Sequence, residues 1–316
     1  MLLRVAERTA VLLVSLAVSS VLVFGFMVLL PGDPARVALG INATEADVAR
    51  LRTEFGLDRS LGEQYLSWVG GLARFDLGLS YVSKAQIAPQ IADRLQVSLI
   101  LVAAPMLIAV ARALPVGTLM AVHHRRASGL ILSAISQIGV AVPAFLAGIL
   151  LITVFAVQLR WLPANGWTPP AYDPADFLTH LLLPALSLGL VQGAVLTRYV
   201  RSAVLDVLRE DFLRTARAKG LTPMRALVRH GMRNAAVPVV TVLGLQLATL
   251  LVGAVVIERV FVIPGLGSLL LDAVGNRDLI VVQDVVMVLV VAVLLVNFLV
   301  DLLYLVIDPR LRAVSR

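Results

Sequence analysis

The chain has 316 residues, of which 59% are hydrophobic and only 15% are charged, and its mean hydropathy is +0.92. Too few charged residues remain to cover a soluble protein of this length, so the composition predicts an integral membrane protein. The net charge of +7 does not indicate nucleic-acid binding, because the basic residues fall between hydrophobic runs rather than on one soluble face. The lack of cysteine excludes disulfides, thiolate chemistry and cysteine metal ligands.

Stretches of roughly 20 apolar residues are long enough to cross a bilayer as helices that satisfy their own backbone hydrogen bonds. The first begins after Arg4 and Arg8 and contains Ala17-Val18-Ser19, which also resembles a signal-peptide cleavage site. Its apolar run continues through Leu30, so we interpret it as a retained helix. The six predicted spans are Thr9–Gly32, Leu95–Val122, a segment within Ala127–Leu159, Phe177–Thr197, Asn234–Ile257 and Val285–Ile307.

The distribution of Lys and Arg predicts that both termini are cytoplasmic, because cytoplasmic loops carry an excess of these residues. The stretch Arg198–Arg233 holds nine Lys or Arg against three Asp or Glu. The loop Trp161–Asp176 has two aspartates and neither Lys nor Arg. The N-terminal arginines and Arg310, Arg312 and Arg316 lie on the predicted cytoplasmic side as well.

The segment from Pro31 to Arg94 is too long to be a turn, so we divide the chain into residues 1–94 and 95–316. The first part holds the first span and a periplasmic subdomain, and the second holds five helices. Thr44 is a predicted N-cap for a helix over Glu45–Leu57, and a second helix is expected over Leu61–Leu72. This subdomain either covers the outer membrane interface or receives a partner.

The most informative segment is basic and lies between the fourth and fifth spans. Its alanines, leucines and arginines favour a helix from about Val204 to Lys219, with Gly220 as C-cap. Thr222 and Pro223 are suited to the N-cap and first position of a second short helix toward Arg233. A loop whose arginines only set topology and contact anionic lipid would explain the charge. It would not explain the predicted small-residue surface, made of Thr215, Ala216, Ala218 and Gly220.

This helix–turn–helix resembles the coupling loop of binding-protein-dependent ABC transporter permeases. The run Arg214-Thr-Ala-Arg-Ala-Lys-Gly220, followed by Arg229-His230, is similar to the dipeptide/oligopeptide/nickel subfamily, and in particular to its first permease subunit. Arg214-Thr215-Ala216 stands where the wider family has Glu-Ala-Ala. Four residues depart from the subfamily pattern. Arg112 is one of them. Phe75 and Asp284 stand where glycine is common, and Ile280 stands where proline is common. Further resembling motifs are Pro31-Gly-Asp-Pro34, Phe55-Gly-Leu-Asp58, Gln64-Tyr65, Arg233-Asn234-Ala235, Glu258-Arg-Val-Phe261, Pro264-Gly-Leu-Gly267 and Ile307-Asp-Pro-Arg310.

The resemblance implies an all-α, type I importer-like transmembrane domain of six helices in the bacterial inner membrane. It implies a second homologous permease, two ATPase subunits that bind ATP and Mg, and an extracytoplasmic substrate-binding protein; this chain itself would bind no cofactor. Closure of the ATPases would push on the coupling helix around Arg214 to Gly220, within the coupling loop 198–234, as a rigid-body switch. Short peptides are the implied cargo, although relatives also carry nickel, haem or glutathione-like compounds. The implied coupling residues are Arg214, Thr215, Ala216, Arg217, Lys219, Gly220 and His230.

No enzyme chemistry is visible in the sequence. Neither Lys84 nor Lys219 lies in a phosphate-binding loop, and the four histidines lack metal-ligand spacing. Gln246 and Thr249, near the middle of the fifth span, are candidates for the translocation pathway. Arg112 and Asp301 are expected to snorkel or to have structural partners rather than to contact substrate. Helix bends are expected at three prolines, which are Pro105, Pro143 and Pro184.

Three other functions compete with this interpretation. An ATPase-independent secondary transporter or channel predicts mid-membrane charge pairs and an inverted repeat, and neither is evident. An intramembrane enzyme requires a Ser–His or paired-Asp arrangement within the spans, which is also not evident. A membrane scaffold is compatible with the sequence but leaves the basic helix–turn–helix without a role.

Overall fold

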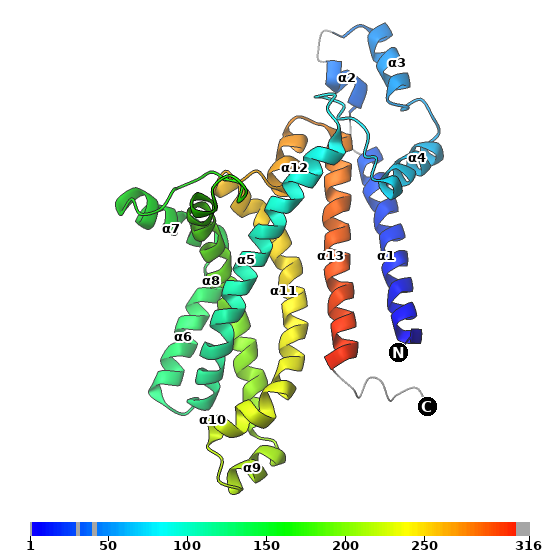
Figure 1. The fold of residues 1–316 in the computed structure, drawn as a ribbon. Helices are drawn as coiled ribbons and strands as arrows, with labels where there is room; N and C mark the ends of the chain where they lie inside the picture. The colour runs from blue at the N-terminus through cyan, green and yellow to red at the C-terminus, as the bar shows by residue number, and fades with distance from the viewer. Residues whose placement is uncertain (1, 30–31, 40–42, 308–316) are drawn as a thin grey trace. The chain divides into compact units, whose positions relative to one another are not determined.

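The computed structural model describes residues 2–29, 32–39 and 43–307. Pro31, Arg310, Arg312 and Arg316, named above, lie outside these ranges. In this part of the chain the regular structure is helical, with one isolated β-bridge between Leu79 and Gln86 (Figure 1). The helices are α1 (Leu2–Leu29), α2 (Pro34–Leu39), α3 (Glu45–Glu54), α4 (Leu61–Arg74), α5 (Ile87–Val122), α6 (Ala127–Ala141), α7 (Ala144–Leu151), the π-helix η1 (Ile152–Gln158), α8 (Pro174–Leu208), α9 (Asp211–Ala218), α10 (Pro223–Ala226), the π-helix η2 (Leu227–Gly231), α11 (Met232–Val260), α12 (Leu266–Gly275) and α13 (Leu279–Ile307).

The chain forms two compact units. Of the described residues, one unit contains 99–263 and 296–307, and the other contains those within 2–98 and 264–295. Helices α5 and α13 each pass from one unit into the other. The N-terminal unit therefore also includes residues 264–295, a late segment of the sequence. The predicted division between residues 94 and 95 places this segment in the second part.

Among the described residues, five helices are long and apolar enough to cross a membrane, and each overlaps one of the predicted spans. The remaining span, predicted as one helix within Ala127–Leu159, is instead a pair of helices bent by 98°. The break lies at Val142 and Pro143, because proline lacks an N–H donor and forces the residue before it into an extended conformation. Pro105 and Pro184, by contrast, lie inside continuous helices. If the bent pair is counted as one span, the described chain has six.

Small residues bring α5 and α8 into close contact. A Cβ atom on Gly189 would lie 3.0 Å from Cβ of Ile108, and one on Gly117 would lie 2.8 Å from the carbonyl oxygen of Thr197. Gly189 and Gly193 form a small-xxx-small pattern, which allows helices in membranes to approach closely. The Ser136 hydroxyl then attaches α6 to α8 by donating to the carbonyl of Ala194.

The N-terminal unit confirms both short helices predicted after the first span. Thr44 is the N-cap of α3, and its side chain accepts a hydrogen bond from the Asp47 amide. Helix α4 begins with a capping box between Ser60 and Glu63. Figure 1 shows α3 beyond the end of α1 and α4 beside that end, where Phe24 contacts Tyr65 and Trp68 of α4.

Candidate functional site

The basic segment 198–234 begins within α8, which ends at Leu208. The predicted continuous helix from Val204 to Lys219 is wrong, because the backbone turns at Arg209 and Glu210 before α9 starts at Asp211. Glu210 is extended, with ψ of 143°, and therefore interrupts the helical hydrogen bonds. Asp211 then lies in the first turn of α9, where a negative charge is favourable.

Helix α9 has one buried face. Leu213 is 1% exposed and Ala216 is 8% exposed, and both pack into an apolar cluster with Val204, Val207 and Leu227. Ala216 is therefore not part of the predicted small-residue surface, because it faces the core. Burying this face fixes the position of α9 relative to the end of α8.

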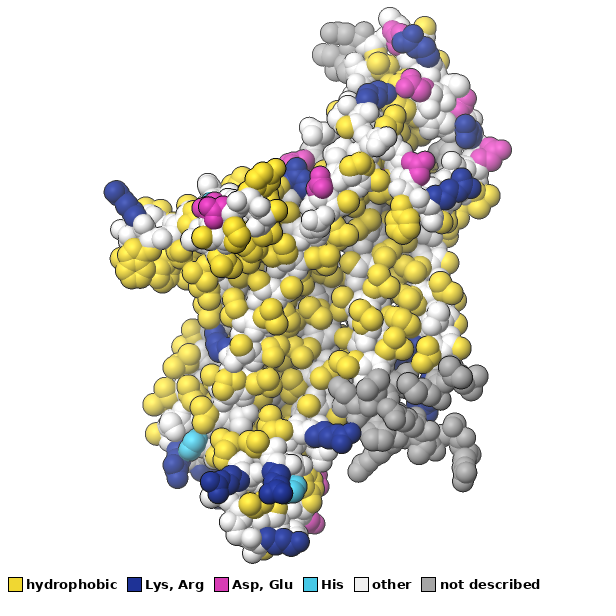
Figure 2. Space-filling model, in the orientation of Figure 1, with side chains coloured by type: hydrophobic (Ala, Val, Ile, Leu, Met, Phe, Trp, Pro, Cys, Tyr) yellow, Lys and Arg dark blue, Asp and Glu magenta, His cyan; other side chains and the backbone are white. Residues whose placement is uncertain are grey.

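The opposite face of α9 is exposed and basic. Arg214, Thr215, Arg217 and Lys219 are all exposed, and Figure 2 shows Lys and Arg side chains gathered at this end of the molecule. The Arg214 guanidinium lies 3.3 Å from the Asp211 carboxylate, but both side chains are exposed, so this ion pair contributes little to stability. The basic face is thus available for contact with another protein.

A tight turn joins α9 to α10, as the sequence predicts. Gly220 has φ of +92°, a conformation that L-residues rarely adopt, and a Cβ atom there would meet nothing within 4 Å. The Thr222 side chain accepts a hydrogen bond from the amide of Arg225, and Pro223 occupies the first helical position. The turn is therefore determined by backbone conformation rather than by crowding.

The second helix of the segment continues into a membrane span. Residues Pro223–Val260 form one helical run that includes α10, η2 and α11. Gly231, in η2, is buried, and a Cβ atom there would lie 2.9 Å from side-chain atoms of Leu227 and Val207. His230 is exposed in the same turn. A displacement of α10 would therefore act directly on α11.

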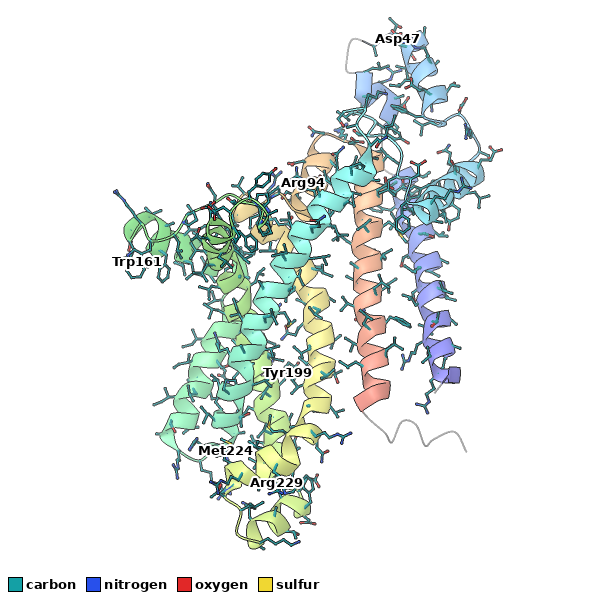
Figure 3. All side chains as sticks on the ribbon, viewed as in Figure 1. Asp47, Arg94, Trp161, Tyr199, Met224 and Arg229 are labelled. Carbon is teal, nitrogen blue, oxygen red and sulfur yellow. The ribbon has the colours of Figure 1, made fainter. Side chains whose placement is uncertain are left out.

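Three exposed apolar residues on this segment were not identified from the sequence. Phe212 is 38% exposed, Met224 is 36% exposed and Val228 is 62% exposed. Figure 3 shows Met224 and Arg229 at the same end of the molecule as α9 and α10. Apolar residues inside an otherwise basic, polar segment are the signal that identifies them. Together with the arginines they make a surface with both apolar and charged contacts, as in protein interfaces.

The predicted pathway residues have different environments. Gln246 is 7% exposed, and its Nε2 atom has no hydrogen-bond partner in the described structure. Thr249 is exposed, and its hydroxyl donates to the carbonyl of Leu245 in the same helix. Arg112 is half-buried beside Gly193, where α5 meets α8, and Asp301 is half-buried in α13. The structure thus places a buried amide and an exposed hydroxyl three residues apart on α11.

The sequence also matches known families of transporters. The family described as "Binding-protein-dependent transport system inner membrane component" matches residues 113–313, and its N-terminal counterpart matches residues 1–102. The chain belongs to this family. It is an ABC transporter permease of the peptide/nickel subfamily and a multi-pass protein of the bacterial inner membrane.

Two relatives and one solved structure illustrate the similarity. The chain is 41% identical over 312 residues to the glutathione transport system permease protein GsiC of Escherichia coli (strain K12), covering 99% of both proteins. It is 40% identical over the same length to the GsiC protein of Shigella flexneri serotype 5b. An inward-facing structure of the MetNI methionine ABC transporter shares the fold with a TM-score of 0.58 and 20% identity, covering 69% of this chain and 96% of that one.

Family membership establishes the class of function. Permease subunits of this family form the membrane part of an importer, while ATP hydrolysis takes place on partner ATPases and a binding protein supplies the substrate. This favours the ABC permease over the ATPase-independent transporter, the intramembrane enzyme and the scaffold considered from the sequence.

Proposed function

We propose that this chain is one half of the translocation pathway of an importer for short peptides, and that it pairs with a second, homologous permease. Both termini and the segment 198–234 face the cytoplasm in this proposal, and the α2–α4 region faces the periplasm. The Lys and Arg distribution supports this orientation. A glutathione permease, GsiC, is a full-length relative, and glutathione is a tripeptide.

The observation that carries the coupling proposal is the two-sided α9. Its buried face, at Leu213 and Ala216, attaches it to α8 and η2, and its exposed face presents Arg214, Arg217 and Lys219. A partner ATPase that moves this helix would therefore also move the helical run that begins at Pro223. We assign coupling roles to Thr215, Gly220 and His230 as well, because they are exposed on the same segment. ATP and Mg would be bound by the ATPase partners.

The coupling proposal is tested by replacing Gly220 with leucine in the complete transporter, reconstituted with its ATPase and binding-protein partners. Because φ of +92° strains a leucine by about 1–2 kcal/mol, the turn shifts, and we expect ATP-dependent uptake to fall about tenfold or more. The membrane-inserted amount should not change. Gly62→Leu is the matched control, because Gly62 is also surrounded by open space but has an ordinary helical conformation. Uptake that survives both Gly220→Leu and removal of ATP would refute the coupling role.

The cargo is tested separately, by uptake competition in cells that express the complete transporter. Labelled glutathione and labelled dipeptides should enter in an ATP-dependent way and compete with one another. Uptake of nickel or haem with no uptake of any peptide would contradict the peptide proposal. It would leave the assignment as an importer permease intact.

A further inference from the structure

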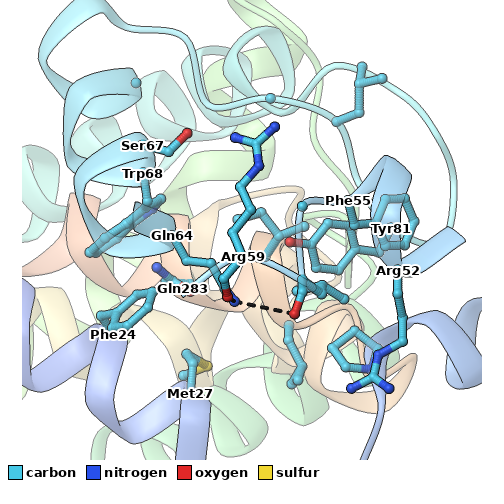
Figure 4. Close-up of a pocket in the computed structure, with 18 of the residues that line it drawn as sticks. Phe24, Met27, Arg52, Phe55, Arg59, Gln64, Ser67, Trp68, Tyr81 and Gln283 are labelled. Atoms are coloured by element: carbon cyan, nitrogen blue, oxygen red, sulfur yellow. Dashed lines mark hydrogen bonds between the residues drawn. The ribbon is translucent and has the colours of Figure 1, made fainter. Parts of the chain in front are cut away.

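A large cavity lies within the N-terminal unit. Its volume is about 930 Å³, which lies in the range of pockets that hold small organic molecules. Its walls come from α1, the start of α2 and the two residues before it, the end of α3, the α3–α4 connection, α4, the loop before α5 and the start of α13. Figure 4 shows Phe24 and Trp68 on one side, Phe55 and Tyr81 on the other, and Gln64 between them. No role described above uses this cavity.

One part of the lining is apolar and belongs to membrane-spanning helices. Phe24, Met27 and Val28 lie in the last turns of α1, and Leu279 and Ile280 lie in the first turn of α13. Val28 is 44% exposed, and the neighbouring Leu29 is 82% exposed. An apolar surface therefore continues from the cavity along α1, a helix that is long and apolar enough to cross a membrane.

The other part of the lining is polar and carries both signs of charge. Arg52 pairs with Asp33 at 3.6 Å, and the Lys84 ammonium lies 3.9 Å from the Glu54 carboxylate. The Arg59 guanidinium, in contrast, forms no hydrogen bond or ion pair within the described residues. An exposed arginine with unused donors is well suited to bind a phosphate group in bidentate fashion.

We propose that this cavity binds a zwitterionic glycerophospholipid from the leaflet at this end of α1. The phosphate contacts Arg59, the headgroup ammonium lies near Asp76 and Glu54, and the glycerol and upper acyl chains lie on Phe24, Met27 and Val28. A soluble zwitterion would satisfy the charged groups but would leave the apolar floor and the exposed end of α1 without a partner. The continuity of the floor with a membrane span thus favours a lipid.

The test uses the complete transporter in nanodiscs of phosphatidylethanolamine and phosphatidylglycerol. After extraction and delipidation, native mass spectrometry counts the phospholipids retained. Ser67→Trp fills the cavity, since Ser67 lines it and is exposed, and Arg59→Gln removes the phosphate ligand. Arg59→Gln is expected to reduce retention of phosphatidylethanolamine about tenfold or more, the effect of losing a charged hydrogen bond. Ser67→Trp is expected to reduce it to a similar extent, because the indole occupies the space that the lipid needs.

Two variants outside the cavity serve as matched controls. Leu66→Trp adds the same ring to an exposed position of α4 that does not line the cavity, and Arg50→Gln removes an exposed arginine that pairs with Asp47. Both should retain lipid as the unaltered protein does. Equal retention in all four variants would refute the site. Displacement of the lipid by inorganic phosphate or by a tripeptide, as effective as displacement by added phosphatidylethanolamine, would show that the occupant is a soluble ligand and would refute the lipid assignment.

Discussion

The indole Nε1 of Trp68 donates a hydrogen bond of 2.7 Å to Oδ1 of Asp284, joining α4 to the start of α13. Asp284 is fully buried, and its other oxygen, Oδ2, has no hydrogen-bond partner in the described structure. The indole is therefore the principal hydrogen-bond donor to this carboxyl group. This contact fastens the α2–α4 region to a membrane-spanning helix.

Trp68→Phe should lower the stability of the protein by about 1–3 kcal/mol, because it leaves a buried carboxyl group without its hydrogen bond. Asp284→Asn keeps a carbonyl acceptor, so it should cost less. Thermal unfolding followed by circular dichroism measures both changes. In the Asp284→Ala background the Trp68→Phe change should lose most of its effect. An equal effect in both backgrounds would show that the hydrogen bond does not stabilise the fold.

Tyr81 should make the protein less stable at alkaline pH. Burial, assisted by the carboxylates of Asp284 and Asp278, raises the pKa of Tyr81 to about 12, from a usual value of 10.0. Stability from the neutral phenol is therefore fully present below pH 10 and is lost as the pH rises toward 12, by about 2–3 kcal/mol in total. Unfolding midpoints measured between pH 9 and pH 12 test this.

Tyr81→Phe should remove this alkaline loss, and the absorbance of tyrosinate should show one fewer group titrating near pH 12 in that variant. Tyr172→Phe is the matched control, because Tyr172 is 86% exposed. If both variants lose stability with pH as the unaltered protein does, the phenol is not responsible.

Leu213→Ala tests whether α9 is held by its buried face. Leu213 is 1% exposed in the cluster that joins α9 to α8 and η2, so truncation should cost about 2–5 kcal/mol. Phe212→Ala alters a neighbouring side chain that is 38% exposed and should cost much less in the isolated chain. The contrast is measured by proteolysis of the 198–234 segment. Equal sensitivity of the two variants would mean that α9 is not anchored through Leu213.

Phe75 is in a strained conformation, and relief of that strain should be measurable. It is the left-handed C-cap of α4, with φ of 59°, and its ring is 86% exposed. Phe75→Gly should raise stability by about 1 kcal/mol, because glycine adopts this conformation freely. Phe75→Ala removes the ring but keeps the strain, so it should give no increase. A gain in the alanine variant equal to that in the glycine variant would attribute the effect to the ring.

The apolar runs and the caps were predictable because each depends on neighbours in sequence. Thr44 and Thr222 are the N-caps expected of them, and Gly220, expected as the C-cap of α9, lies one residue after the C-cap Lys219. The breaks were harder to predict. Pro143 indicated a bend but did not indicate that the bend would reach 98°. Arg209 and Glu210 look like residues of a continuing polar helix, so the sequence did not indicate the break before α9. Such breaks depend on how the following segment packs.

Long-range pairing could not be predicted from the sequence. Trp68 and Asp284 are 216 positions apart, and neither belongs to a motif that indicates the other. The cavity in the N-terminal unit likewise depends on several segments whose association is set by tertiary contacts. For the coupling segment, charge and small residues were visible, whereas the inward orientation of Ala216 depends on the break at Glu210.

The sharp bend after Ala141 has a consequence for the surrounding bilayer. Helix α6 has 15 residues, which rise only about 22 Å, whereas the hydrocarbon core of a typical membrane is about 30 Å thick. The neighbouring α8, with 35 residues, is longer than this core. The protein thus presents a short hydrophobic height on its α6 side, and this mismatch favours a thinned annulus of lipid there. We therefore expect the α6 side of the permease to respond to the acyl-chain length of the surrounding lipid.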